Sequence, residues 1–205
     1  LMAGPPGADP LVIRDLEFLG GMASAGGWRA HVELPAVGFA GRANVGKSTL
    51  LNKLVRRKAL ARVSRTPGRT REINFFRVND QFVIADLPGY GYARISKAQR
   101  AGWGPLIEGY LRTSQRLQGV VLLLDVRHDP TDEDRQMIDS PAELGVPTVI
   151  AVTKIDKLPR TRAVARVAEL AKLVGMDDDQ MVPFSGVTGA GRDELAEAIV
   201  ALLAQ

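Results

Sequence analysis

One glycine-rich segment has the residue types and the spacing that bind nucleotide phosphates. Residues 41–49 read GRANVGKST and fit the pattern G-x-x-x-x-G-K-[ST], with the fixed places held by Gly41, Gly46, Lys47 and Ser48. The glycines let backbone N–H groups turn inward around an anion, the lysine reaches the β- and γ-phosphates, and the serine hydroxyl is a ligand for Mg²⁺. An apolar run precedes the segment and a helical pattern follows it, as this motif requires. The sequence therefore predicts a nucleoside triphosphate site.

A second loop is expected on the phosphate side of the same site. Asp86, Leu87, Pro88 and Gly89 come at the end of the apolar run QFVIAD. An acid there holds Mg²⁺ through a water molecule, and the N–H group of the glycine contacts a γ-phosphate. A Pro-Gly pair also ends strands without any such role. Its position at the end of an apolar strand favours the phosphate interpretation.

The loop of residues 66–72, TPGRTRE, is predicted to complete the metal shell when a γ-phosphate is present. Thr70 is the better candidate ligand, because Thr66 precedes a proline that restricts its conformation. An ordinary exposed turn is the alternative.

Two further loops predict that the base is guanine. Thr153, Lys154, Ile155 and Asp156 end another apolar run and resemble N-K-x-D. A carboxylate at Asp156 accepts hydrogen bonds from guanine N1–H and from the 2-amino group, which adenine lacks in that arrangement, while the lysine stem covers the base. Threonine stands where asparagine is usual, so we expect one hydrogen bond fewer to the neighbouring loops. The segment from Phe184 to Gly186 is expected to offer a backbone N–H group to guanine O6.

The elements between these loops predict how they are brought together. Apolar runs alternate with helical patterns, at VELPAVGFA, INFFRV, QFVIAD, GVVLLLDV, VPTVIAVT and DQMVPFS. Buried strands separated by helices are typical of a mostly parallel sheet covered on both faces, and Asn79-Asp80 indicates a hairpin turn. We therefore predict an α/β P-loop NTPase fold, a doubly wound and mostly parallel six-stranded sheet with one antiparallel edge strand.

Two of the helices have further expected features. Thr131 or Asp132 is the expected N-cap of a helix that stops at Gly145. The helix over residues 158–175 is expected to carry its apolar residues on one face. These residues are Val164, Val167, Leu170 and Leu173.

Composition limits the class of protein. The 205 residues, 45% of them hydrophobic, suit one domain with a sizeable core. The absence of cysteine excludes disulfides and thiolate metal sites and fits a reducing cytoplasm. No run of 18 uncharged apolar residues is present, so no membrane span is expected. We expect residues 1–10 to be a disordered leader or a cloning remnant, and residues 11–205 to form a single domain.

The net charge of +4 is modest, but the basic residues are concentrated in one region. Between residues 53 and 77 the only acid is Glu72, against Lys53, Arg56, Arg57, Lys58, Arg62, Arg65, Arg69, Arg71 and Arg77. This region is either a solvated surface or a contact for a phosphate backbone beside the nucleotide site.

Three strings, GRANVGKSTLLN, TPGRTREINFF and DLPGYGYA, closely resemble the EngB (YihA/YsxC) family of the TrmE-Era-EngA-EngB-Septin-like GTPases. The resemblance covers residues 11–205. It implies a cytoplasmic, monomeric, Mg²⁺-dependent GTPase that acts in assembly of the large (50S) ribosomal subunit on 23S rRNA and is needed for cell division and septation. Family members often read F-S-S or F-S-A at the last loop, so Gly186 implies a looser loop with the backbone contact kept.

The resemblance also assigns the site residues. Catalysis is assigned to Lys47, Thr70 and Gly89, and the metal to Ser48 and Thr70, with Asp86 acting through water. The nucleotide contacts are Gly41, Arg42, Ala43, Asn44, Val45, Gly46, Lys47, Ser48, Gly68, Arg69, Thr70, Arg71, Glu72, Asp86, Leu87, Pro88, Gly89, Thr153, Lys154, Ile155, Asp156, Phe184, Ser185 and Gly186.

Hydrolysis is expected to be slow in isolation. Ras-like switches orient water with a glutamine just after D-x-x-G, whereas this chain has Tyr90 there. In related GTPases an asparagine at the position of Asn44 helps to bind K⁺, so K⁺ stimulation is a hypothesis, with simple bracing of the loop as its alternative.

Two other functions remain open. A nucleotide-gated module for septum partners would share the site, but no amphipathic anchor or lipidation motif supports a membrane partner. A P-loop kinase would need a lid and an acceptor pocket, and no insertion long enough for either is present.

Overall fold

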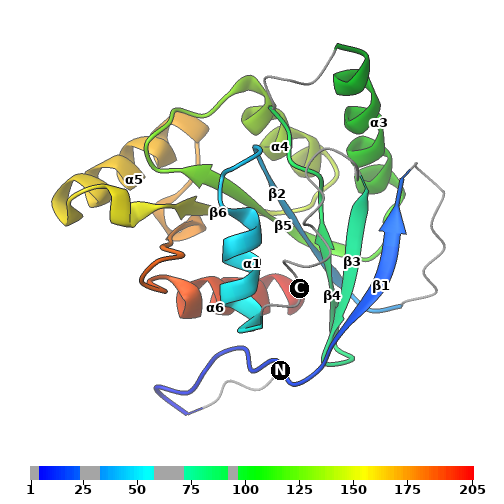
Figure 1. The fold of residues 1–205 in the computed structure, drawn as a ribbon, viewed down its shortest axis with the longest axis horizontal. Helices are drawn as coiled ribbons and strands as arrows, with labels where there is room; N and C mark the ends of the chain where they lie inside the picture. Colours follow the sequence, from blue (N-terminus) through cyan, green and yellow to red (C-terminus); the bar gives the residue numbers. More distant parts are fainter. Residues whose placement is uncertain (1–4, 24–32, 58–71, 92–96) are drawn as a thin grey trace.

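The computed structural model describes residues 5–23, 33–57, 72–91 and 97–205, with the backbone alone for residues 97–103. Within these ranges one sheet holds seven strands in the order β1-β3-β4-β2-β5-β6-β7 (Figure 1). The strands are β1 (Leu16–Met22), β2 (Ala36–Gly41), β3 (Ile73–Val78), β4 (Phe82–Asp86), β5 (Leu117–Asp125), β6 (Thr148–Thr153) and β7 (Met181–Pro183). The α-helices are α1 (Lys47–Val55), α3 (Lys97–Thr113), α4 (Asp132–Glu143), α5 (Arg160–Val174) and α6 (Arg192–Leu203).

The central strands are buried on both faces, as their apolar sequences predict. Every residue of β2 and β6 is buried, and β2 pairs in parallel with both β4 and β5. One core packs α3, α4 and α5 against one face of the sheet, and a second core packs α1 and α6 against the other. The parallel strands therefore end at one edge of a three-layer structure, where their loops meet.

The fold class predicted from the sequence is confirmed, but the sheet has one strand more than the six expected. The additional strand, β1, pairs antiparallel with β3 and occupies the edge that the β3–β4 hairpin was expected to form. Its sequence, LEFLGGM, contains two glycines and lacks a clear alternation of apolar and polar residues. The segment that precedes β1 is held by a side chain of the hairpin turn. Asn79 Oδ1 accepts hydrogen bonds from the N–H groups of Arg14 (2.8 Å) and Asp15 (3.0 Å).

The hairpin turn itself is confirmed. Asn79 and Asp80 both have a φ of 52°, the left-handed conformation that a two-residue turn of this kind needs. The α4 N-cap is also confirmed at Thr131, whose hydroxyl accepts a hydrogen bond from the N–H group of Asp134 (3.2 Å) while the Asp134 carboxylate accepts one from the Thr131 N–H group (2.9 Å). This reciprocal pair is a capping box.

The predicted apolar face of α5 is wrong at two positions. Leu170 is fully buried, but Val164 and Leu173 are 66% and 37% exposed. Alanines 163 and 171 take the buried places instead. The helical period rotates residues 164 and 173 away from the sheet, so size and hydrophobicity alone misplaced them.

The packed part of the chain starts before residue 11. Asp9 forms an ion pair with the buried side chain of Arg192 at the start of α6. No helix in the described part of the chain is long and apolar enough to cross a membrane.

Candidate functional site

The loop of residues 42–46 joins the end of β2 to the start of α1, in the strand–loop–helix order predicted for a phosphate site. Gly46 has a φ of 102° and precedes α1 without a side-chain cap, so side chains leave the first N–H groups of the helix free. Asn44 is also left-handed, with a φ of 65°. A helix start without a side-chain cap is suited to bind phosphate.

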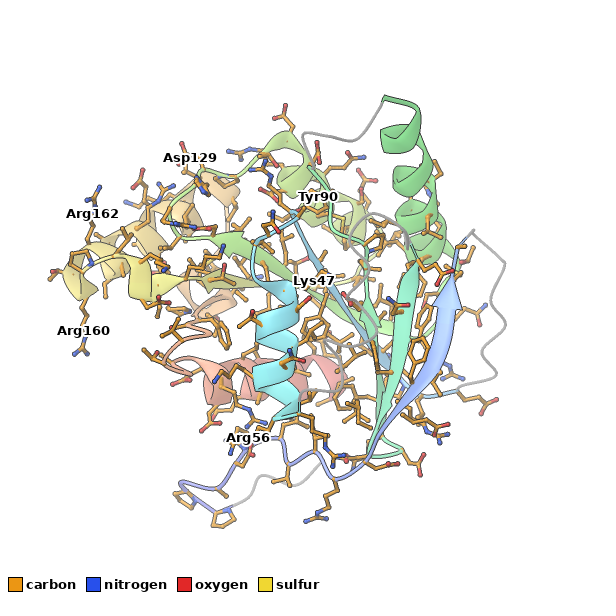
Figure 2. The ribbon with its side chains drawn as sticks, viewed as in Figure 1. Lys47, Arg56, Tyr90, Asp129, Arg160 and Arg162 are labelled. Carbon is orange, nitrogen blue, oxygen red and sulfur yellow. The ribbon has the colours of Figure 1, made fainter. Side chains whose placement is uncertain are left out.

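Lys47 lies at the first turn of α1, facing the end of β4 (Figure 2). Its ammonium group forms an ion pair with Asp86 and donates a hydrogen bond to the carbonyl oxygen of Leu87 (2.7 Å). The side chains of Lys47 and Asp86 are only 15% and 9% exposed. The predicted phosphate-binding lysine and the predicted metal-side acid therefore meet in one place.

The loop after β4 is held tightly against the phosphate loop. The N–H group of Leu87 donates to Phe39 O (3.0 Å), and that of Ala43 donates to Tyr90 O (2.7 Å). Gly89 lies between these two attachments, where a Cβ atom would stand only 3.3 Å from the Cα of Ala43. This close approach favours glycine at the residue expected to contact a γ-phosphate.

Tyr90, which follows, is fully buried and is not placed to orient a water molecule. Its hydroxyl donates a hydrogen bond to the Asp134 carboxylate in the first turn of α4. Burial raises the pKa of Tyr90, and the negative charge of Asp134 raises it further, so the hydroxyl keeps its proton. The sequence predicts only that glutamine is missing at this position and gives no sign of this contact.

Two side chains at the end of β6 and just after it lie against the phosphate loop. The hydroxyl of Thr153 donates to the carbonyl oxygen of Val45 (2.7 Å) and lies 3.3 Å from that of Leu124. The ammonium group of Lys154 donates to the carbonyl oxygen of Asn44 (2.7 Å). Threonine at the usual asparagine position thus still links the base-side loop to the phosphate loop.

The second base-side loop contacts the first. The Ser185 hydroxyl donates to the Asp156 carboxylate (2.8 Å), and its oxygen accepts hydrogen bonds from the N–H groups of Val187 (3.2 Å) and Thr188 (3.1 Å). The N–H group of Ile155 donates to Phe184 O (3.3 Å). The carboxylate predicted to read guanine is therefore oriented by the loop predicted to contact its O6.

Glycine at position 186 also has a packing reason. A Cβ atom there would collide with the methyl group of Thr49, in the first turn of α1. This loop therefore lies close against α1 at Gly186.

A charged group at the end of β5 was missed by sequence analysis. Asp125 accepts hydrogen bonds from Arg127 Nε (3.0 Å) and Nη2 (2.8 Å), and Lys154 lies 3.4 Å away. Burial by itself raises the pKa of Asp125, but the hydrogen bonds and charges of Arg127, with the charge of Lys154, outweigh it and lower the pKa to about 2. This carboxylate fixes the lysine beside the phosphate loop. The only signal in the sequence was an acid ending the apolar run over residues 120–126.

The residues present fit a magnesium ion that arrives with a nucleotide. Among the described residues no group of three or more His, Cys, Asp or Glu side chains could hold a metal by itself. Ser48 and Asp86 provide a hydroxyl and a buried carboxylate beside the phosphate loop. Mg²⁺ is commonly held by one or two such side chains together with phosphate oxygens.

One predicted part of the site lies outside the described residues. It comprises Gly68, Arg69, Thr70 and Arg71, the switch-loop candidates. Glu72 is described, and its carboxylate lies against Gly21 of β1, where a Cβ atom would collide with it.

Comparison with known proteins agrees with this geometry. A family model described as 50S ribosome-binding GTPase matches residues 36–154, and one described as the Elongation factor Tu GTP binding domain matches residues 107–205. A curated protein from Gemmatimonas aurantiaca, "Probable GTP-binding protein EngB", is 68% identical over 95% of each chain.

Solved structures give the same picture. A crystal structure of a probable GTP-binding protein engB aligns over 82% of this chain and 98% of its own with a TM-score of 0.67 at 23% identity, which supports the fold. A structure of Era in complex with MgGDPNP and nucleotides 1506-1542 of 16S ribosomal RNA aligns over 84% of this chain and 57% of its own, with a TM-score of 0.61 at 25% identity.

Proposed function

Because the chain belongs to the EngB family of GTP-binding proteins, we propose that its GTP-hydrolysing site acts as a switch in assembly of the large (50S) ribosomal subunit. The main support for a switch is that the loops of the site contact one another in sequence. At the carboxyl edge of the sheet the phosphate loop contacts both the loop after β4 and the first guanine-reading loop, and the two guanine-reading loops contact each other. A domain built this way is a P-loop GTPase.

The side chains divide the work of binding and hydrolysis. Lys47 binds the β- and γ-phosphates, Gly89 offers its N–H group to the γ-phosphate, and Asp156 reads guanine. Ser48 and Asp86 would hold Mg²⁺, which would supply positive charge against the phosphates. Since Tyr90 is buried, no side chain directly after Gly89 orients the attacking water, and hydrolysis by the protein alone is slow.

The ribosomal part of the proposal is supported by the description of the matching family model and by charge. Lys53, Arg56 and Arg57 are exposed at the end of α1. Arg56 is only weakly paired, at 3.7 Å from Asp9 and 3.9 Å from Asp193. Basic side chains that are not neutralised by close carboxylates suit the phosphate backbone of 23S rRNA. In the same proposal the protein is a cytoplasmic monomer, and loss of large subunits impairs cell division and septation.

Co-sedimentation tests the proposal directly. The protein is loaded with a non-hydrolysable GTP analogue or with GDP and spun with 50S particles at several salt concentrations. We expect the GTP-loaded form to pellet with the particles and the GDP-loaded form to remain in the supernatant. Equal pelleting of the two forms would contradict a switch.

Charge reversal then tests the surface. The triple variant Arg56→Glu, Arg57→Glu and Lys58→Glu should bind particles more weakly and with a shallower salt dependence. The control, which reverses two charges in place of three, is Arg160→Glu with Arg162→Glu, on the exposed first turn of α5, well separated from Arg56 (Figure 2). Equal losses in both variants would indicate a general charge effect and no specific contact through the end of α1.

A further inference from the structure

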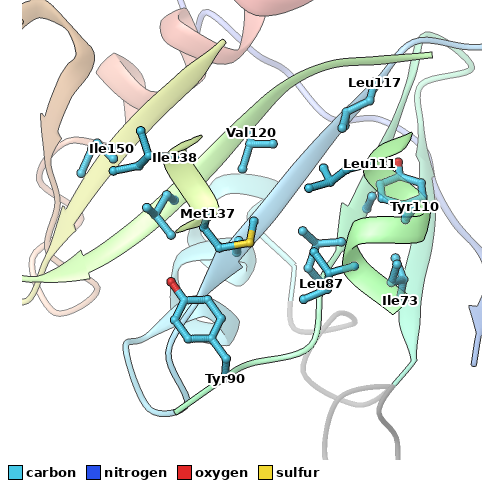
Figure 3. Packing of buried hydrophobic residues seen from close by; sticks show 14 of the residues in the cluster. Ile73, Leu87, Tyr90, Tyr110, Leu111, Leu117, Val120, Met137, Ile138 and Ile150 are labelled. Atoms are coloured by element: carbon cyan, nitrogen blue, oxygen red, sulfur yellow. The ribbon is translucent and has the colours of Figure 1, made fainter. Parts of the chain in front are cut away.

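The segment after β4 carries a buried tyrosine for which hydrolysis has no direct use. Tyr90 is 0% exposed and packs in the core beneath α4, close to Met137 (Figure 3). It directly follows Gly89, whose N–H group is the proposed γ-phosphate contact. A residue at this point is positioned to control the glycine.

The backbone of Tyr90 is bonded to the phosphate loop on both sides. Its N–H group donates to Gly41 O (3.3 Å), and its carbonyl oxygen accepts from the N–H group of Ala43 (2.7 Å). Arg42 and Tyr90 thereby form a parallel bridge that extends the β2–β4 pairing. Gly89 is thus enclosed between this bridge and the attachment of Leu87 to Phe39.

The side chain of Tyr90 is anchored at its other end by a charged acceptor. The Asp134 carboxylate accepts the Tyr90 hydroxyl on Oδ1 and the N–H group of Thr131 on Oδ2 (2.9 Å). The same carboxylate therefore holds the tyrosine and completes the capping box of α4. Asp134 is only 2% exposed, so both contacts are made by a buried carboxylate.

The next residue is also shaped by the phosphate loop. Gly91 has a φ of 74°, and a Cβ atom there would stand 2.8 Å from Nε of Arg42. In Gly89-Tyr90-Gly91 the two glycines therefore let the backbone lie close against residues 42 and 43, while the central residue carries the side chain that enters the core.

We infer that Tyr90 is a positioning residue whose hydrogen bond to Asp134 holds Gly89 ready for the γ-phosphate and ties that contact to the N-terminal cap of α4. The inference rests on the proposed function and names how its site senses the third phosphate. A preorganised N–H group binds its partner without a further ordering loss, which raises affinity for the ligand that reaches it. GTP has a γ-phosphate to accept the Gly89 N–H group and GDP does not. The hydrogen bond between Tyr90 and Asp134 therefore favours binding of GTP over GDP.

Calorimetry with Tyr90→Phe tests the role of this hydrogen bond, because the change removes the hydroxyl and keeps the ring. We expect affinity for a non-hydrolysable GTP analogue to fall by about tenfold, the size of one lost charge-assisted hydrogen bond, with affinity for GDP changed by less than about twofold. A variant that loses affinity for both nucleotides equally, or for neither, would overturn the inference.

A control variant separates positioning from stability. Tyr110→Phe makes the same chemical change in the same core cluster, where Tyr110 is 7% exposed and contacts Phe75. It should keep the wild-type ratio of GTP-analogue to GDP affinity. A changed ratio in this control would show that the ratio follows stability and would overturn the role of Tyr90.

Hydrogen exchange provides a second test, which uses the wild-type protein and so does not depend on whether a variant folds. In the wild-type protein the amides of residues 131–137 should exchange more slowly with the GTP analogue than with GDP, because coupling between the two contacts is reciprocal. Equal exchange would overturn the coupling to α4. Failure of the wild-type protein to bind GTP, or to pellet with 50S particles, would instead overturn the proposed function.

Discussion

Lys47 and Asp86 form an ion pair that joins the phosphate loop to the loop after β4. The ammonium group also donates to Leu87 O, so one side chain connects the two loops that enclose the phosphates. Both partners are largely buried, and removal of either leaves an uncompensated charge.

Lys47→Ala should therefore abolish tight binding of GTP, as measured by calorimetry. It should also lower the free energy of unfolding by about 1–3 kcal/mol, because Asp86 loses its charged hydrogen-bond donor. Lys53→Ala, an exposed lysine on the same helix, is the matched control and should change neither quantity. Wild-type affinity in Lys47→Ala would refute the phosphate site.

Asp156→Asn should shift preference from GTP toward XTP, because the amide suits the xanthine carbonyl group. The expected reading in a competition assay is a lower affinity for GTP with a gain for XTP. Ser185→Ala removes the hydroxyl that donates to Asp156, and it should lower the affinities for GTP and XTP together. An unchanged order of preference in Asp156→Asn would contradict base reading by this carboxylate.

Asn44 provides a test of K⁺ activation. In the wild-type protein the GTPase rate should be higher in KCl than in matched NaCl. Asn44→Gly removes the side chain but tolerates the left-handed φ of 65°, so the loop keeps its shape and the K⁺ effect should disappear. Equal rates in the two salts for the wild-type protein would exclude the activation, and persistent stimulation in the variant would exclude the Asn44 side chain as its ligand.

The loops of the site could be predicted because phosphate and guanine binding depend on short, fixed spacings. Gly46, Lys47, Asp86 and Asp156 each act within a few residues of a strand end, and an apolar run marks each strand. Parallel strands then bring their ends together whatever the intervening sequence is. The order of strands and loops therefore carried most of the information about the site.

The contacts that were missed join residues far apart in the chain. Tyr90 meets Asp134, and Gly186 meets Thr49, but nothing in either local sequence indicates its partner. The edge strand β1 was missed for a similar reason. Its glycines weaken the strand pattern, and pairing with β3 supplies the order that local propensity lacks.

Acid should destabilise the protein through Asp125. Its pKa of about 2 in the folded protein lies below the ordinary 3.8, so its contribution is fully present above about pH 4 and is lost as pH falls through 2. The size is on the order of 2 kcal/mol. Urea denaturation between pH 7 and pH 2 should show a shallower acid loss for Asp125→Asn than for the wild type. Asp139→Asn, at an exposed position of α4, should retain the wild-type slope.

Arg192 is expected to contribute more stability than any exposed arginine with which it is compared. Its Nη2 donates to Leu11 O (2.8 Å) and Leu54 O (2.8 Å), and Nη1 forms an ion pair with Asp9. The planar guanidinium thus joins the segment before β1, the end of α1 and the start of α6, a geometry that an ammonium group cannot reproduce.

Arg192→Ala should lower the free energy of unfolding by about 2–4 kcal/mol, because buried carbonyl oxygens and a carboxylate lose their donors. Arg192→Lys should recover less than half of that loss, since charge without the fork satisfies fewer acceptors. Arg56→Ala removes an arginine whose side chain is 63% exposed and should cost less than about 0.5 kcal/mol. Urea denaturation of the three variants decides the matter, and equal values for Arg192→Ala and Arg56→Ala would show that the buried network does not hold these three segments together.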